Sequence, residues 1–156
     1  MLKIFHKITA GLLVIASFAM TLSACTGFQP KVQTDLDFHV YNPQEKALFP
    51  VTSTLITGPN EAILFDAQFQ KNDAENLVNM VKASGKKLTT IYISHGDPDY
   101  YFGLDVLHAS FPEARIVATP ATVEKIKNSM QGKKAYWGPI LKENAPKELI
   151  LPEALL

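Results

Sequence analysis

Helix and strand signals alternate along most of this 156-residue chain, and few architectures accommodate that order. Three segments carry apolar residues at helical spacing, and each follows a short segment rich in β-branched residues. The expected helices are 72–83, 104–111 and 119–132, and the strands expected before them are 62–65, 88–93 and 115–118. Such an order favours helices packed on a sheet that contains parallel strands. We therefore expect an α/β (α+β) fold.

The chain before residue 66 predicts an antiparallel start to the sheet. Segments 38–41 and 51–57 are rich in β-branched and aromatic residues, and a turn signal at 58–60 separates them from the strand expected at 62–65. A further short strand is expected at 149–151.

Local signals also predict where the helices begin and end. Asn72 and Glu75 form a cap-like pair at the start of the first helix. Thr119 followed by Pro120 is typical of an N-cap and first helical position. Gly132 is expected to end that last helix.

The amino terminus has the composition of an export signal. Lys3 and Lys7 precede an uncharged apolar run at 8–22, which is too short for a comfortable membrane span. Leu22-Ser23-Ala24-Cys25 follows, and it resembles the lipobox of bacterial lipoproteins. The resemblance implies a signal peptide at 1–24 and lipidation of Cys25. The alternative is an ordinary secretory signal with an incidental cysteine.

A lipidated Cys25 would anchor the protein to membrane lipid in the bacterial cell envelope. Thr26 stands where retention signals of inner-membrane lipoproteins often carry Asp, so the outer membrane is preferred if the source is Gram-negative. We expect residues 25–37 to form a tether and residues 38–156 to form the folded domain. Cys25 is the only cysteine, which leaves no thiol for a disulfide or for catalysis once it is lipidated.

Composition limits the classes of function. The chain has 15 Lys+Arg and 15 Asp+Glu, and its pI is near 6.9. No excess of positive charge is available to neutralise a phosphate backbone, so we expect no nucleic-acid partner. The 47% apolar content argues against a disordered chain.

Residues 94–103 carry the candidate chemistry, where a buried strand ends and a helix begins. The run Ile91-Tyr92-Ile93-Ser94-His95, followed by Asp99 and Gly103, resembles the signature of the metallo-β-lactamase superfamily. That signature is a strand leading into His-x-His-x-Asp-His with a glycine shortly after. Asp66, after the apolar run 63–65, matches the family's second marker. The resemblance implies a four-layer αββα sandwich, of which this chain represents largely the N-terminal half and is incomplete at its C-terminus.

The residue types suit a metal site. Imidazole and carboxylate oxygens bind zinc and similar divalent ions, and ligands one residue apart on an extended stretch point the same way. We therefore take His95, Asp97 and Asp99 as candidate ligands. The resemblance implies one or two divalent metal ions, with zinc the expected metal, and hydrolysis of a small molecule whose identity the sequence does not specify. It also implies that Asp99 acts as general base and that Asp66 helps to order the ligand loop.

The sequence departs from the signature at two positions. Asp97 stands where the motif has its second histidine, and Tyr100 stands where it has the last. A carboxylate can replace an imidazole, whereas a tyrosine must lose a proton with a pKa near 10 to bind a metal well. The family draws further ligands from its second half, and the only histidine after His95 is His108.

Other interpretations of the chain therefore stay open. It could be a non-catalytic surface lipoprotein that uses the fold as a binding module, or a truncated gene product. At residue level, Asp97 could simply cap a helix opened by Pro98.

Overall fold

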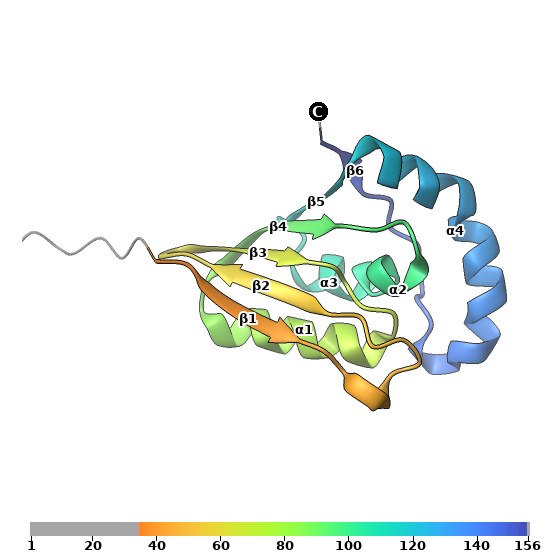
Figure 1. The fold of residues 1–156 in the computed structure, drawn as a ribbon, viewed down its shortest axis with the longest axis horizontal. Helices are drawn as coiled ribbons and strands as arrows, with labels where there is room; N and C mark the ends of the chain where they lie inside the picture. The colour runs from red at the N-terminus through yellow and green to blue at the C-terminus, as the bar shows by residue number, and fades with distance from the viewer. Residues whose placement is uncertain (1–34, 156) are drawn as a thin grey trace, which may run out of the picture. The chain divides into compact units, whose positions relative to one another are not determined.

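The computed structural model describes residues 35–155, which belong to one compact unit. The predicted signal peptide, Cys25 and the tether up to residue 34 lie outside the described residues. Six strands form one sheet in the order of the sequence, β1-β2-β3-β4-β5-β6. Their bounds are β1 Asp37–Tyr41, β2 Ser53–Thr57, β3 Glu61–Phe65, β4 Lys87–Ile93, β5 Arg115–Ala118 and β6 Glu153–Ala154 (Figure 1).

The sheet is mixed, as the sequence predicts. Strands β1, β2 and β3 pair in antiparallel fashion, with a tight turn between β2 and β3, and β3, β4, β5 and β6 pair in parallel. Each of the first two parallel pairs is joined by helical segments, because parallel neighbours need a crossover connection. The predicted α/β class is confirmed.

Four α-helices and two short 3₁₀ helices complete the fold. Their bounds are α1 Lys71–Ser84, α2 Pro98–Tyr101, α3 Leu104–Ser110 and α4 Pro120–Leu141, with η1 Gln44–Lys46 and η2 Lys142–Asn144. Helix α1 starts one residue before the predicted helix, at an N-cap Gln70 that makes no side-chain capping bond. The prediction that Asn72 and Glu75 cap this helix is therefore wrong. At its other end, Gly85 adopts the left-handed conformation (φ 65°) that commonly ends helices.

Helix α4 begins where the sequence predicts and ends much later. The Thr119 hydroxyl accepts a hydrogen bond from the Thr122 amide at 3.2 Å, which confirms the N-cap. Gly132 does not end the helix, which continues to Leu141. The reason is tertiary packing, because the Trp137 ring lies edge-on to Phe69, with centroids 5.4 Å apart. This contact stabilises the turns beyond the glycine.

The predicted strand at 149–151 is wrong. Leu149 and Ile150 instead pack against the core from a non-strand segment, and the last strand, β6, forms at Glu153–Ala154 beside β5. The apolar side chains of residues 149–151 favour a strand there. The backbone pairs with β5 only from Glu153 onward.

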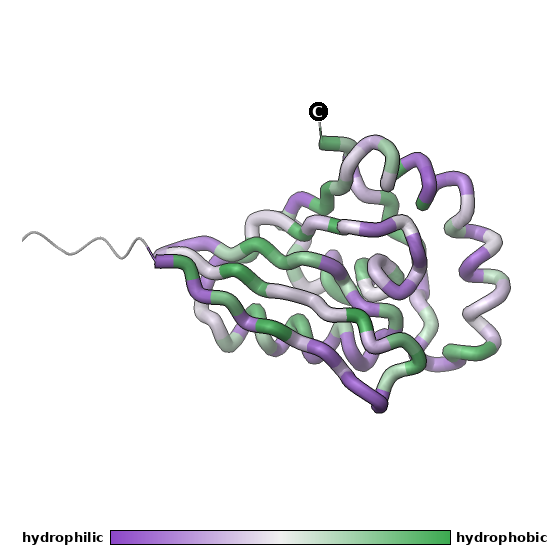
Figure 2. Tube along the Cα trace, in the orientation of Figure 1, coloured by the Kyte–Doolittle hydropathy of each residue, from purple (hydrophilic) through white to green (hydrophobic). Residues whose placement is uncertain are grey.

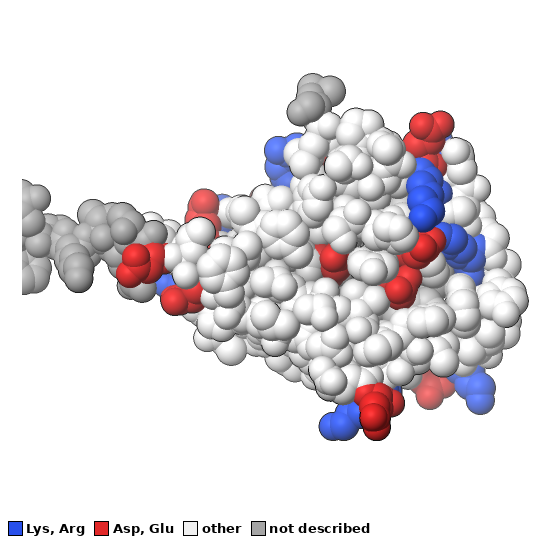
Figure 3. Space-filling view, viewed as in Figure 1, with Lys and Arg blue, Asp and Glu red and all other residues white. Residues whose placement is uncertain are grey.

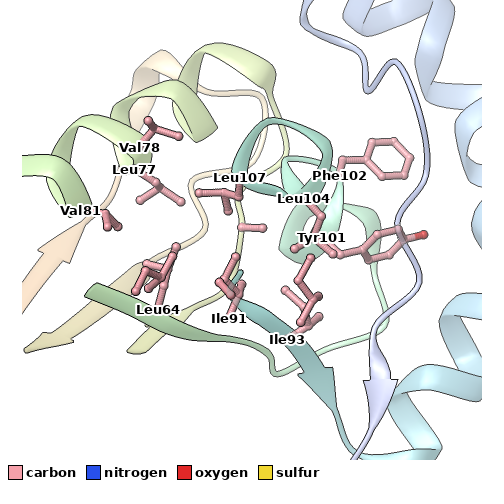
Figure 4. Packing of buried hydrophobic residues seen from close by; sticks show 14 of the residues in the cluster. Leu64, Leu77, Val78, Val81, Ile91, Ile93, Tyr101, Phe102, Leu104 and Leu107 are labelled. Carbon is pink, nitrogen blue, oxygen red and sulfur yellow. The ribbon is translucent and has the colours of Figure 1, made fainter. Parts of the chain in front are cut away.

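The core lies between one face of the sheet and helices α1, α2 and α3. Figure 4 shows Leu64, Ile91 and Ile93 pointing from the strands toward Leu77 of α1 and Leu107 of α3. All five side chains are fully buried. Hydrophobic residues concentrate along the strands, whereas α4 is largely hydrophilic (Figure 2). Side chains alternate between the two faces of each strand, so every second residue of a strand points toward these helices.

The opposite face of the sheet is apolar and open among the described residues. Phe38 and Val40 on β1 are 63% and 65% exposed, and Ile63 on β3 is 39% exposed. A shallow pocket of about 520 Å³ lies between β2 and β3 near residues 58–61. This face bears few charges over the strands (Figure 3). Most of its lining lies around the β2–β3 turn, whereas the loop that carries the candidate chemistry follows the carboxyl end of β4.

Among residues 35–155, none of the helices combines the length and the apolar composition needed to cross a membrane.

Gly103 closes the core where α2 meets α3. Its amide donates a hydrogen bond to the Gln68 carbonyl at 3.0 Å. A Cβ atom at this position would overlap the Ala67 carbonyl oxygen and would lie 2.6 Å from the Ala74 Cβ. The glycine of the motif is therefore needed for close approach of two backbone segments, and not for an unusual backbone angle.

We predict that Gly103→Ala lowers the free energy of unfolding by about 3 kcal/mol, because neither the Ala67 backbone nor α1 can yield without strain. Gly132→Ala is the matched control, since its Cβ would meet nothing within 4 Å in the middle of α4. It should raise the free energy of unfolding by about 0.5–1 kcal/mol. Urea denaturation of the two variants measures both effects, and equal stabilities would contradict the packing argument.

Candidate metal-binding loop

The candidate site lies in residues 94–97, the segment between β4 and α2, which we name the β4 loop. Strands β3 and β4 run in parallel, so the residues that follow their carboxyl ends meet at one edge of the sheet. Asp66 follows β3 directly, and Ser94 follows β4 directly. Asp66 and Ser94, the residue before His95, are therefore adjacent although they are 28 residues apart in sequence.

Asp66 fastens the β4 loop to the end of β3. Its carboxylate accepts hydrogen bonds from the Ser94 amide at 2.8 Å and from the Ser94 hydroxyl at 2.7 Å. The side chain is 7% exposed, and its backbone has a φ of 63°, a left-handed conformation that Asp tolerates better than most residues. Burial raises the pKa of Asp66, and the two bonds from Ser94 oppose that rise. The carboxylate is committed to positioning the loop.

His95 and Asp97 lie side by side on the loop. The His95 Nδ1 and Asp97 Oδ2 atoms are 3.3 Å apart, and both side chains are a little under half exposed. Alternate residues on an extended stretch share a face, as the sequence predicts. The Tyr100 ring packs beside the His95 ring, with centroids 5.0 Å apart, which gives the tyrosine a packing contact at the place where the family motif has its last histidine.

Two lysines of α4 complete the surroundings of Asp97. The Lys133 Nζ donates to Asp97 Oδ1 at 2.7 Å and to the Gly96 carbonyl at 2.9 Å. The Lys125 Nζ lies 3.4 Å from the same Oδ1. The hydrogen bond from Lys133 and the two positive charges lower the pKa of Asp97. Figure 3 shows acidic and basic side chains next to one another beside α4.

Sequence reasoning missed both lysines. Lys125 and Lys133 are eight residues apart on a helix whose exposed positions are mostly polar, and nothing in their spacing separates them from other surface lysines. Asp97 does occupy the N-cap position of α2, but its side chain makes no capping bond. The simple capping interpretation of Asp97 therefore does not hold in the structure, because its carboxylate faces α4 instead.

Asp99 lies in the first turn of α2 and is partly buried. Burial raises the pKa of its carboxyl, and the neighbouring negative charge of Asp97 raises it further. The structure thus shifts the pKa values of Asp97 and Asp99 in opposite directions, that of Asp97 downward and that of Asp99 upward.

The donor atoms of His95 and Asp97 face one another at the distance of an ion pair, which is also the spacing expected of two ligands of one ion. Two ligand atoms that each lie about 2.0–2.1 Å from a tetrahedral zinc ion are about 3.3 Å from one another. The observed separation of Nδ1 and Oδ2 is 3.3 Å. Lysine contacts occupy Oδ1 of Asp97 and leave Oδ2 facing the imidazole. These two residues could supply two ligands at most, Lys125 and Lys133 place two positive charges at one of them, and no three His, Cys, Asp or Glu side chains among residues 35–155 form a group that could hold an ion.

Comparisons with known proteins agree with this description of the fold. The uncharacterized protein YobT of Bacillus subtilis is 34% identical over 71 residues, which cover 46% of this chain and 30% of that protein. A metallo-β-lactamase from Hirschia baltica has a similar structure, with a TM-score of 0.51, 15% sequence identity, and coverage of 78% of this chain and 47% of that chain. A metallo-β-lactamase from Erythrobacter litoralis gives a TM-score of 0.47 and 18% identity, covering 61% of this chain and 42% of that one.

The chain thus spans less than half the length of these proteins. A family model described as the metallo-β-lactamase superfamily matches residues 47–154, which include the whole sheet except β1 and all four α-helices. The predicted markers Asp66, His95 and Asp99 all lie within the matched region. This chain belongs to the metallo-β-lactamase superfamily and has its metallo-hydrolase-like fold.

Proposed function

We propose that the protein is a metal-dependent hydrolase that uses the β4 loop as part of its active site. The observation that carries this proposal is the 3.3 Å separation of His95 Nδ1 and Asp97 Oδ2 at the end of β4 in a chain of this superfamily. His95 and Asp97 would supply two ligands of a divalent ion, with zinc the expected metal. Further ligands would have to come from outside the described residues or from solvent.

When bound, such an ion supplies Lewis-acid polarisation of the substrate and activation of water. The residues of the chain have separate tasks around it. Asp66 holds Ser94 and thereby fixes the direction in which the β4 loop leaves the sheet. Asp99, whose pKa is raised by burial, would take up a proton as general base. The substrate class is a small molecule with a hydrolysable bond, since the fold hosts several such chemistries and does not choose among them.

A second candidate function is a non-catalytic binding module with the same fold. Lys125 and Lys133 favour this binding module, because their two positive charges beside the Asp97 carboxylate oppose the approach of a dication. The chain also spans only part of the length of its relatives, and we infer no activity of those longer proteins for it. Metal binding separates the two candidates.

We predict that the full chain carrying Cys25→Ser, purified in a non-ionic detergent, binds zinc or a similar divalent ion through the β4 loop. The Cys25→Ser change removes the only thiolate that could bind metal elsewhere. His95→Ala in this background should lower the affinity for zinc by tenfold or more, because it removes one of the two ligands. Isothermal titration with Zn²⁺, followed by elemental analysis after desalting, measures the change.

The matched control is His108→Ala, which removes an exposed histidine of α3 outside the loop. Its zinc affinity should equal that of the parent chain. A folded parent chain that binds no zinc, or one whose zinc affinity is unchanged by His95→Ala, would overturn the hydrolase proposal and favour the binding module. Removal of bound metal with a chelator should abolish any esterase or lactonase activity that the parent chain shows.

Asp66 provides an independent prediction about the loop. Asp66→Ala should lower the free energy of unfolding by about 3 kcal/mol, because it removes two hydrogen bonds to a buried carboxylate and places alanine at a positive φ. Asp66→Asn should cost less than half as much, since asparagine tolerates this φ and keeps an acceptor for the Ser94 amide. Thermal denaturation of both variants tests this, and equal losses would contradict the proposed role.

We also propose that Cys25 anchors the protein to membrane lipid in the bacterial envelope. The support is the sequence Leu22-Ser23-Ala24-Cys25 after an apolar run. A lipid anchor of this kind holds a folded domain at a membrane surface without a membrane-spanning helix.

Cys25→Ser should shift the protein from the membrane fraction to the soluble fraction of bacterial cells. Lys31→Ser, six residues further along, is the control for a change in the same segment and should leave the protein with the membranes. Labelling with a radioactive fatty acid should mark the parent chain and not the Cys25→Ser variant. Equal membrane fractions for the two variants would show that the cysteine is not the anchor.

A further inference from the structure

Two rows of uncharged side chains cross the open face of the sheet from β1 to β4. The first row, followed from strand to strand by register, is Phe38, Ile56, Ile63 and Thr90. Residues directly opposite one another on neighbouring strands share a face of the sheet. Leu64, the residue after Ile63, is fully buried in the core, so this row points away from the core. Phe38 and Ile63 are exposed to solvent.

The second row has the same character. It is Val40, Thr54, Phe65 and Tyr92. Val40 is exposed, and the rings of Phe65 and Tyr92 lie beside one another with centroids 5.4 Å apart. Neither row contains a charged residue, and Figure 3 shows few charges over these strands. A sheet with an apolar face gains free energy when another layer covers that face, so the two rows form a surface suited to a second apolar layer.

The charges at the margins of this face are balanced. Glu61 lies opposite Lys87 in the register of β3 and β4. Arg115 on β5 pairs with Glu153 on β6, with 3.3 Å between the guanidinium nitrogen and the carboxylate oxygen. A partner with a strongly charged surface finds no complementary charge here, whereas a second copy of the chain meets no excess of its own sign. Charge therefore permits self-association through this face.

The face also carries a projection and a hollow that suit one another. The Phe38 side chain on β1 is 63% exposed. The shallow pocket of about 520 Å³ lies on β2 and β3, and Ile56 and Ile63 form part of its wall. Phe38 and Ile63 stand in one row on either side of β2. A two-fold axis along β2 therefore places the Phe38 of each copy over the Ile63 of the other, beside the pocket. Such a patch complements itself, which is the requirement for a two-fold interface.

We propose that the open face of β1 to β4 is a dimer interface, on which a second copy of this chain packs sheet against sheet about a two-fold axis along β2. Sheets that pack in this way lie about 10 Å apart, with strand directions within about 30° of one another. The two copies would form four layers, with the two sheets inside and the helices of each copy outside. This is the αββα order that the family resemblance implies, formed by two chains.

The area of the face limits the strength of the dimer. Four strands spaced about 4.8 Å apart, with about five residues of about 3.3 Å each, cover about 300 Å² in plan on each copy. The accessible area that two copies bury is larger, because side chains project from the sheet, but it stays near the lower bound of about 1,000–1,200 Å² for a specific interface. We therefore expect a weak dimer that dissociates in the micromolar range.

The test measures self-association of the full chain carrying Cys25→Ser and Asn128→Cys in a non-ionic detergent. Asn128 is exposed on α4, and its replacement gives the chain a single thiol for a fluorescent label. A mixture of donor-labelled and acceptor-labelled chains should show energy transfer that is half-maximal at about 10 µM protein. Phe38→Glu should weaken association at least about tenfold, because it places an unpaired charge in an apolar interface.

Tyr136→Glu is the matched control. Tyr136 lies on α4, outside both rows, and its side chain is 65% exposed, close to the value for Phe38. The two variants replace an exposed aromatic residue by the same charge, and both keep the apolar segment at 8–22, so association through the detergent micelle affects them equally. Tyr136→Glu should leave the energy transfer of the parent chain unchanged.

A mixing experiment tests the two-fold axis itself. Ile63→Lys should weaken self-association for the same reason as Phe38→Glu. A mixture of Phe38→Glu chains with Ile63→Lys chains should recover most of the energy transfer, since the new glutamate of one copy then faces the new lysine of the other. A different register or a different axis gives no such recovery, because the two substituted positions would not meet.

Thermal denaturation checks that each variant is folded, and Val40→Glu takes the place of Phe38→Glu if that chain is not. A parent chain without energy transfer at about ten times the expected concentration would overturn the proposal and leave the face to residues before 35 or to a different partner. Equal losses in Phe38→Glu and Tyr136→Glu, or no recovery in the mixture, would overturn it as well. None of these measurements involves a metal ion, so the result is independent of metal binding by the β4 loop.

Discussion

The pair of hydrogen bonds between Asp66 and Ser94 joins the ends of β3 and β4, and the geometry of the candidate site depends on it. Without this link the β4 loop would lose the contact that fixes its direction at the point where it leaves the sheet. The bonds are strong because a buried carboxylate accepts both of them. Burial raises the pKa of Asp66, so part of the stabilisation is offset by the cost of keeping a charge out of water. The arrangement favours a defined loop over maximal stability.

Helix α4 forms the other wall of the site, although only three of its residues are buried. Its position follows from the packing of Trp137 against Phe69, from the bonds of Lys133 to the β4 loop one turn earlier, and from the buried Ile126 and Met130. A largely polar helix is thus held by a few specific interactions. Because Lys133 bonds both the Gly96 carbonyl and Asp97, a movement of α4 would alter the orientation of the Asp97 carboxylate, which links the outer helix to the chemistry of the loop.

The two faces of the sheet have different roles in the described residues. One face is covered by α1, α2 and α3, and its side chains form the core (Figure 4). The other face exposes Phe38, Val40 and Ile63. Exposed apolar area of this kind usually marks a surface that contacts other protein.

The sequence by itself determined the α/β class, five of the six strands, the beginning of α4 at Thr119, and the placement of His95 beside Asp97 after β4. These features follow from local periodicity, from turn and cap residues, and from spacing along one strand. Only the tertiary structure decided how far α4 extends, where β6 pairs, which oxygen of Asp97 faces His95, and that Lys125 and Lys133 reach this carboxylate. The physical reason is that these contacts join residues about 30 or more positions apart, so their energy comes from packing and not from any pattern within a single segment.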